Sequence, residues 1–494
     1  MRELLLGIDV GTSACKITVF ETNGNVLVTL NGKYKALHPK SGWAEQNPED
    51  WWNAVSYCVR EIFSDTNIKP SEISAIGIDG ISWAAVAVDN NGDCLCNCPL
   101  WFDTRSQEIC NELNYNLGSE NIFRLSGNPL KPGYTTPKVL WYKKYFPEMY
   151  SRINKILQCN GYIAFKLTGK YSQDLSQGYG WHCFDMHSGT WNENMISAMK
   201  INKNLLPEIV PCDFVIGKVN HNASIQTGLL EGIPVVAGGL DAACGTLGAG
   251  VIHAGETQEQ GGQAGGMSIC LDNYISDERL ILSFHVIRDK WLLQGGTTGG
   301  GGVIRWFSEN FKSNFSEIND LAEKIPAGSE GLIFLPYMMG ERTPIWDTNA
   351  KGVFYGIDFS KTKGHFIRAC MEGVALALRH NLTAAEEAGA NSNELRAMGG
   401  SANSLLWTQI KSDVTGRKIV VPSSDTATTL GAAMLAGVGV GIYANYDDAV
   451  SKTVKITRKH EPDFSKSEIY NKTYENYIEL YESLKNLMRK TGGI

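Results

Sequence analysis

The sequence lacks any long hydrophobic run: nowhere do about 18 or more uncharged apolar residues follow one another, so no membrane-spanning helix is expected. It also lacks a block of basic residues, and its formal net charge of -7 argues against nucleic acid as the main partner. Internal repeats of short period and low-complexity tracts are absent too. These absences leave room for a phosphorylated small molecule, because such a ligand needs only a few local donors.

The chain has twelve cysteines but no pair in CxxC spacing. Its start, where Glu3 and Asp9 interrupt a very short apolar run, is not typical of a signal peptide. Cys94, Cys96 and Cys98 alternate at strand spacing, but no further metal ligands accompany them. We therefore expect reduced, mostly structural cysteines and a cytoplasmic protein.

At 494 residues and 54.2 kDa, the chain exceeds what one hydrophobic core normally supports. The composition, with 43% hydrophobic and 20% charged residues, is that of an ordinary globular protein. We expect two domains, 1–250 and 251–494, with the boundary near 250–256.

Strands and helices alternate in both halves, which predicts an α/β fold. Amphipathic helices are expected at 51–63 and 365–389, and strands at 73–81 and 84–93. Three segments each predict a strand that runs through a glycine-rich turn into a helix: 232–250, 290–311 and 395–410.

The stretch GIDVGTSACK, residues 7–16, allows two interpretations. One is a hairpin whose Gly-Thr-Ser turn is merely solvated. The other is a phosphate cradle, in which Gly11 exposes backbone N–H groups, Thr12 and Ser13 add donors, and Asp9 holds a metal ion.

Glycines cluster with small polar residues in four turns, at 7–13, 261–266, 295–302 and 399–403. Glycine permits close backbone approach, and a helix N-terminus adds partial positive charge. One such turn needs no ligand to explain it, but four turns split between two halves favour a nucleotide held in a cleft between domains.

Over nearly its whole length the chain resembles the FGGY carbohydrate kinases, and it is most similar to xylulokinase-like members. The resemblance implies two ribonuclease-H-like domains of the actin, hexokinase and heat-shock ATPase superfamily, with an interdomain cleft that binds ATP and Mg²⁺. The motifs that carry it stand in family order: GIDVGTSACK, WAEQNPEDWW, LWFDTRSQE, GYTTPKVLWYKKY, PVVAGGLDAACGTLGAG, YMMGERTP, KGVFYGIDFS, IRACMEGVALAL, GGSAN and LGAAMLAGVG.

By this resemblance, Asp9 orients the magnesium ion, and Thr12 and Ser13 meet the terminal phosphates. Lys16 adds a positive charge for those phosphates, or is only a solvated strand lysine. Asp241 matches the catalytic base, kept ionised by the helix N-terminus that follows it. Without the resemblance, Asp241 reads as an ordinary N-cap.

The nucleotide side is implied in three places, of which the turns at 295–302 and 399–403 also read as plain helix-initiating turns. The loop GGQAGG departs from the family's Gly-Thr-Ser or Gly-Thr-Gly pattern, because Gln263 and Ala264 replace small polar residues. The residues expected to contact the nucleotide are Gly262, Gln263, Gly301, Arg305, Gly400, Asn403 and Ser404.

On the acceptor side, Trp101 and Asp103 match the family's Trp-x-Asp-x-Arg region. Ser82 and Trp83 stand where xylulokinases carry Met-His and glycerol kinases carry Arg-Glu. The sequence thus predicts an ATP-dependent kinase of a small ketose, polyol or sugar acid, and allows a homodimer. The alternatives are a nucleotide-gated module of the actin type and a degenerate kinase that serves as a sensor.

Overall fold

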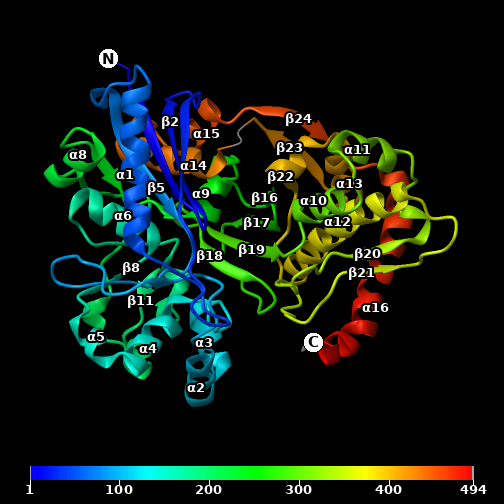
Figure 1. Cartoon of the computed structure of the whole chain (residues 1–494), viewed down its shortest axis with the longest axis horizontal. Helices are drawn as coiled ribbons and strands as arrows, with labels where there is room; N and C mark the ends of the chain where they lie inside the picture. Colours follow the sequence, from blue (N-terminus) through cyan, green and yellow to red (C-terminus); the bar gives the residue numbers. More distant parts are fainter. Residues whose placement is uncertain (1, 424–425, 492–494) are drawn as a thin grey trace.

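The computed structural model describes residues 2–423 and 426–491. Two seven-stranded sheets organise the two halves of the chain (Figure 1), and the α/β expectation is confirmed. The first sheet contains β13 (Val215–Lys218), β14 (Pro234–Val236), β5 (Ile73–Gly80), β1 (Leu4–Val10), β2 (Ala14–Glu21) and β3 (Val26–Lys33), with β15 (Gly239–Leu240) beside β5. The second contains β18 (Ile281–Phe284), β19 (Trp291–Thr297), β17 (Gly265–Leu271), β16 (Glu256–Gly261), β22 (Glu394–Met398), β23 (Lys418–Pro422) and β24 (Ile456–His460).

The two sheets share one pairing pattern. In the first, β1, β2 and β3 form an antiparallel meander, and β5 pairs with β1 in parallel. In the second, β16, β17 and β19 form the meander, and β22 pairs with β16 in parallel. A parallel neighbour needs a crossover connection, so each sheet is covered by helices.

The helices of the first half are α1 (Pro48–Asp65), α2 (Gln107–Leu117), α3 (Ser119–Ser126), α4 (Thr135–Tyr145), α5 (Pro147–Arg152), α6 (Cys159–Thr168), α7 (Glu193–Ala198), α8 (His221–Thr227) and α9 (Asp241–Gly248). Some of them pack against its sheet, and others, such as α2 to α5, form a region that lies below the sheet in Figure 1. Short strand pairs tie this region together: β4 (Glu45–Gln46) with β7 (Cys98–Pro99), β6 (Val86–Val88) with β8 (Lys155–Leu157), β9 (Gln173–Asp174) with β12 (Ile209–Val210), and β10 (Phe184–Asp185) with β11 (Thr190–Trp191).

The second half carries α10 (Gly301–Asn310), α11 (Phe315–Glu323), α12 (Lys363–Glu387), α13 (Leu405–Thr415) and α16 (Ser467–Thr491), with the pair β20 (Ile333–Leu335) and β21 (Val353–Tyr355). The expected stripe on α12, which includes Ile367, Met371 and Val374, is buried in the core of this half. No helix in the described part of the chain is long and apolar enough to cross a membrane.

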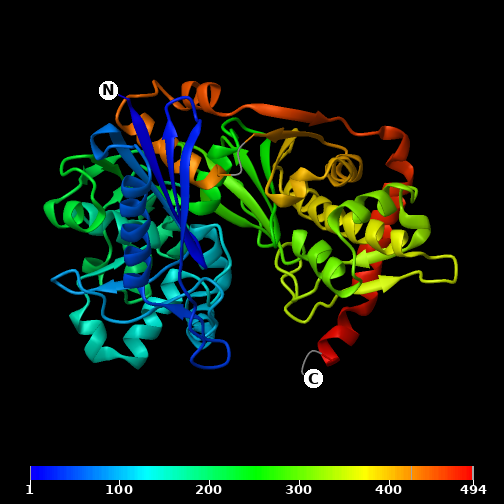
Figure 2. The same cartoon turned by 45° about the horizontal axis from the view of Figure 1, so that its top comes forward.

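One helix of the second half in sequence lies on the first sheet in space. Helix α14 (Ala427–Gly439) packs against β1, β5 and α9, followed by α15 (Tyr446–Thr453). Both helices are orange beside the blue strands in Figures 1 and 2. Glycines allow this approach, because a Cβ at Gly77 would lie 1.8 Å from the Ala432 carbonyl oxygen and one at Gly431 1.9 Å from that of Cys244.

Gly77→Ala is therefore expected to lower the free energy of unfolding by about 1–3 kcal/mol, because the new methyl group forces α14 away from β5. Urea denaturation of the purified protein measures this change. Gly400→Ala is the matched control, since a Cβ there meets no atom within 4 Å. Equal urea midpoints for both variants and the wild type would contradict the tight packing of α14.

Candidate active site

A cavity of about 600 Å³ lies between the two halves, and both contribute to its walls. From the first half come Thr12, Ser13, Ser82, Trp83, Trp101, Tyr179, Asp241 and Ala242. From the second half come Gln258, Gln260, residues 262–268, Ile281, residues 294–296 and Arg342. The expected cleft is present, and it joins three of the four glycine-rich turns.

Asp241 is the first residue of α9 and lines this cavity, but it does not cap the helix. The N-cap is Leu240, and the Asp241 carboxylate instead accepts a 2.6 Å hydrogen bond from the N–H of the next residue, Ala242. Burial, with the charge of Asp9 added, raises the pKa of Asp241 to about 7. Burial thus opposes the helix N-terminus, which is expected to keep this group ionised.

Two further carboxyl groups lie on adjacent strands beside Asp241. Asp9 on β1 pairs in register with Asp79 on β5. Thr428 donates a 2.8 Å hydrogen bond from Oγ1 to Asp9, whose pKa is nevertheless raised by burial. Neither carboxyl oxygen of Asp79 has a partner in the described structure, and burial raises its pKa well above the usual value. Buried carboxyl oxygens of this kind suit a divalent cation.

The turn between β1 and β2 is a hairpin that also forms a wall of the cleft, so its position fits a phosphate cradle, which stays a prediction. Gln46 donates from Nε2 to the Thr12 carbonyl at 2.7 Å, and Trp101 donates from Nε1 to the Thr12 hydroxyl at 3.2 Å. Lys16 lies opposite Asp9 in the register and offsets part of the rise in its pKa, but it does not line the cavity.

A second hollow of about 230 Å³ continues from the cleft into the second half. Five of the residues expected on the nucleotide side line it together with Ser404: Gly262, Gln263, Gly301, Arg305 and Gly400. Asn403 is exposed and does not line this hollow. Ser404 caps α13 by accepting from the Trp407 N–H at 3.1 Å, so the helix-initiating role holds for this residue.

The second and third glycine-rich turns bind each other. The N–H of Gly301 donates to the Gly262 carbonyl at 2.6 Å, and that of Gly302 donates to the Gln263 carbonyl at 3.0 Å. A Cβ at Gly300 would lie 2.4 Å from the backbone of Ala264. Two of the N–H groups at the start of α10 are therefore engaged within the protein in this conformation.

A buried ion pair under the second turn was missed by sequence reasoning. Lys411 on α13 contacts Glu259 on β16 at 2.6 Å and donates to the Ser401 hydroxyl at 2.7 Å. Lysine and glutamate are almost never buried unless they are paired. No local sequence signal joins positions 259 and 411, since only the fold brings the two elements together.

Trp83 forms a rigid wall on the acceptor side. Its φ of 59° places a bulky residue in the left-handed region, which costs backbone strain. The indole stacks on Tyr134 with centroids 4.0 Å apart, and Lys138 donates a 2.8 Å hydrogen bond to the Trp83 carbonyl. The indole Nε1 is buried without a partner in the described structure. Tyr179, which the sequence did not single out, lines the same wall.

Asp103 is not brought to the cavity. Its buried carboxylate accepts from the Ala44 N–H at 2.6 Å and pairs with Arg105 at 2.9 Å. The role expected for Asp103 as an acceptor-binding residue is therefore corrected to that of a loop anchor. It fixes the turn that presents Trp101, because Asp103 and Trp101 belong to one tight segment.

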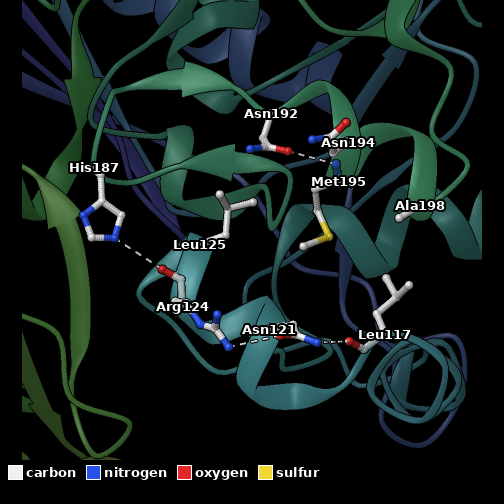
Figure 3. A pocket seen from close by; sticks show the side chains of 9 residues that line it. All are labelled: Leu117, Asn121, Arg124, Leu125, His187, Asn192, Asn194, Met195 and Ala198. Carbon is white, nitrogen blue, oxygen red and sulfur yellow. Dashed lines mark hydrogen bonds between the residues drawn. The ribbon is translucent and has the colours of Figure 1, made fainter.

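A separate hollow of about 530 Å³ lies between α3 and α7 (Figure 3). Some of its polar groups pair with one another: Arg124 donates to Asn121 at 3.2 Å, and His187 lies 3.3 Å from the Arg124 carbonyl. The described residues that line it include no carboxylate. The chemistry therefore belongs to the interdomain cleft.

Comparison with known proteins agrees with this geometry. Residues 4–248 match the model of the FGGY family of carbohydrate kinases, N-terminal domain, and residues 273–440 match the C-terminal domain. Two relatives from Bacillus subtilis (strain 168) are each 29% identical: a xylulose kinase over 98% of this chain and 97% of its own length, and a gluconokinase over the same two shares. The ligand-bound xylulose kinase from Lactobacillus acidophilus superposes with a TM-score of 0.92 at 25% identity, covering 99% of each chain. With both family domains matched around a cleft lined by the Asp241 carboxylate, the chain belongs to the FGGY carbohydrate kinases and is a sugar phosphotransferase.

Proposed function

We propose that this enzyme transfers the terminal phosphate of ATP to a hydroxyl of a small ketose, polyol or sugar acid, with Asp241 as general base. One observation carries the proposal. Asp241 is a half-buried carboxylate whose pKa is raised to about 7 by desolvation and by Asp9, and it lines a cavity whose opposite wall is made of glycine-rich turns. A base works best when its pKa is close to the working pH.

Asp241 accepts the proton of the attacking hydroxyl as the new O–P bond forms. Phosphoryl transfer is largely dissociative, so this proton leaves late and positioning matters more than basicity. Thr12 and Ser13 supply hydroxyl and backbone donors to the terminal phosphates, and the Trp101 indole orients the Thr12 hydroxyl.

Magnesium fits the carboxyl groups of the cleft, with Asp9 as the residue that would hold it. The described residues include no cluster of three protein ligands close enough for a metal cage. Mg²⁺ usually binds one or two carboxylates together with substrate phosphates. When bound, it neutralises charge on the phosphates.

Two other functions compete with the proposal: an actin-like module gated by nucleotide, and a sensor that has lost activity. The aromatic wall of Trp83, Trp101 and Tyr179 beside Asp241 argues against the actin-like module, which needs no sugar-sized acceptor site. A sensor would keep such a site, so turnover distinguishes it from the kinase. The decisive experiment measures ATP consumption by the wild type against ketoses, polyols and aldonates. ATP turnover that no acceptor stimulates would overturn the proposal.

Transfer also requires the halves to close, because Asp241 and the nucleotide hollow belong to different halves. Small-angle X-ray scattering is expected to show a smaller radius of gyration with ADP and the best acceptor than with either alone. Closure would also exclude water that hydrolyses ATP. Identical profiles with and without both ligands would count against a mobile cleft.

Three expectations stay predictions. They are the domain boundary near 250–256, the homodimer and the cytoplasmic location. Limited proteolysis, sedimentation and cell fractionation test them respectively.

A further inference from the structure

Arg342 lies on the wall of the cleft opposite the first phosphate turn. Its guanidinium carbon is 5.6 Å from the centre of the Trp101 ring, which belongs to the other half of the chain. The same indole donates from Nε1 to the Thr12 hydroxyl. The Trp101 side chain therefore lies between Arg342 and the turn expected to hold the terminal phosphates.

Among the described residues that line the 600 Å³ cavity, Arg342 is the one cationic side chain. In the described structure its guanidinium makes a single long hydrogen bond, 3.4 Å from Nη2 to the Thr297 carbonyl. Arginine carries five N–H donors in a fixed fork, so most of its donor capacity is unused here. Among the described residues no carboxylate forms an ion pair with it: the neighbouring Glu341 attracts the guanidinium, but its hydrogen-bonded oxygen accepts from backbone N–H groups.

The residues on both sides of Arg342 hold it in place. Glu341 accepts from the Thr298 N–H at 2.7 Å, and Thr343 accepts from the Gly296 N–H at 2.6 Å. The guanidinium covers Gly296 so closely that a Cβ there would lie 2.8 Å from Nη2. A cation fixed before the reaction needs no reorganisation when charge develops.

We propose that Arg342 contacts the phosphoryl group during its transfer, an inference that rests on the proposed kinase function. The bond between phosphorus and the ADP oxygen breaks, the bond to the acceptor oxygen forms, and the hydroxyl proton moves to Asp241. Arg342 keeps its own protons throughout and donates N–H groups to the non-bridging oxygens, where negative charge concentrates.

The test compares Arg342→Gln, Arg342→Lys and Arg342→Ala with the wild type on its best acceptor. We expect kcat to fall by about 10²–10³ in Arg342→Gln, the usual effect of losing one preorganised donor. Arg342→Lys recovers only part of this loss, since ammonium lacks the planar fork. Free guanidinium ion is expected to restore part of the rate in Arg342→Ala.

Binding of a transition-state mimic provides a second measurement, which would not change if Arg342 had only a structural role. Calorimetry with ADP and aluminium fluoride, a mimic of the phosphoryl group in transfer, is expected to show loss of binding in Arg342→Gln. Binding of ADP alone should be retained. Arg288→Gln, which removes an exposed pair with Asp213, is the matched control and should behave as wild type in both assays.

The outcomes separate the two proposals. A wild type that phosphorylates no acceptor overturns the proposed function. An active wild type together with an Arg342→Gln variant of unchanged kcat overturns the role of Arg342. So does a variant with normal kcat whose KM rises only for carboxylate-bearing acceptors, because Arg342 would then bind the acceptor.

Discussion

Asp241→Asn is expected to lower kcat by about 10²–10⁴ and to leave ATP binding nearly unchanged, because it removes the general base without changing the shape of the side chain. The structure supports this separation. The group makes one recorded hydrogen bond, from the Ala242 N–H, and an amide oxygen can accept that bond equally well.

Steady-state kinetics and nucleotide calorimetry on the same preparations check this prediction. Asp272→Asn is the control, since it removes a carboxylate that pairs with Lys290 on the surface. Asp241→Asn is also expected to be no less stable than wild type near neutral pH, because the neutral amide removes a desolvated negative charge from beside Asp9. Near-normal turnover in Asp241→Asn would show that this group is structural.

The pH profile follows from the same residue. Burial and Asp9 raise the pKa of Asp241 to about 7, so a decreasing fraction of the base is ionised as the pH falls below that value. The wild-type kcat/KM is expected to fall about tenfold for each unit below this pKa. A profile that stays flat between about pH 5 and 8 would exclude Asp241 as the titrating base.

Local patterns predicted the elements that place the site. The alternation around GIDVGTSACK gives the hairpin of β1 and β2, and the apolar stripe at 365–389 gives α12. The hairpin depends on contacts between residues close in sequence, and α12 depends on an apolar face that repeats at helical spacing. The apolar segment before Asp241 gives β14 and β15 in the same way, and so places the carboxylate at a strand end.

Long-range contacts account for what the sequence did not predict. Helix α14 returns to the first sheet because glycines on two elements, Gly77 and Gly431, admit its backbone, and neither has a local signature for that packing. The pairing of Glu259 with Lys411 needs both elements in place. Asp103 looked like a ligand because it lies near Trp101, but the Ala44 N–H and Arg105 occupy its carboxylate.

The second large effect concerns substrate choice, which we expect Trp83 to control. Its indole is held between neighbours, with the Tyr134 ring 4.0 Å away and Tyr179 5.6 Å away, so it cannot turn aside for a different acceptor. Its one N–H donor is buried and unpaired in the described structure, and the indole stands where xylulokinases carry a histidine ring.

An acceptor hydroxyl that loses its partner costs about 1–3 kcal/mol, which corresponds to about a tenfold to hundredfold loss of kcat/KM. We therefore expect D-xylulose to be a poor substrate compared with another ketose, a polyol or a sugar acid. A comparison of kcat/KM across such a panel measures this preference. Trp83→His is expected to shift the preference toward D-xylulose, while Trp52→Phe, which alters a buried indole on α1 away from the cleft, should not. If D-xylulose is the best substrate of the wild type by a wide margin, Trp83 does not set the specificity and the overall likeness to xylulose kinases is the better guide.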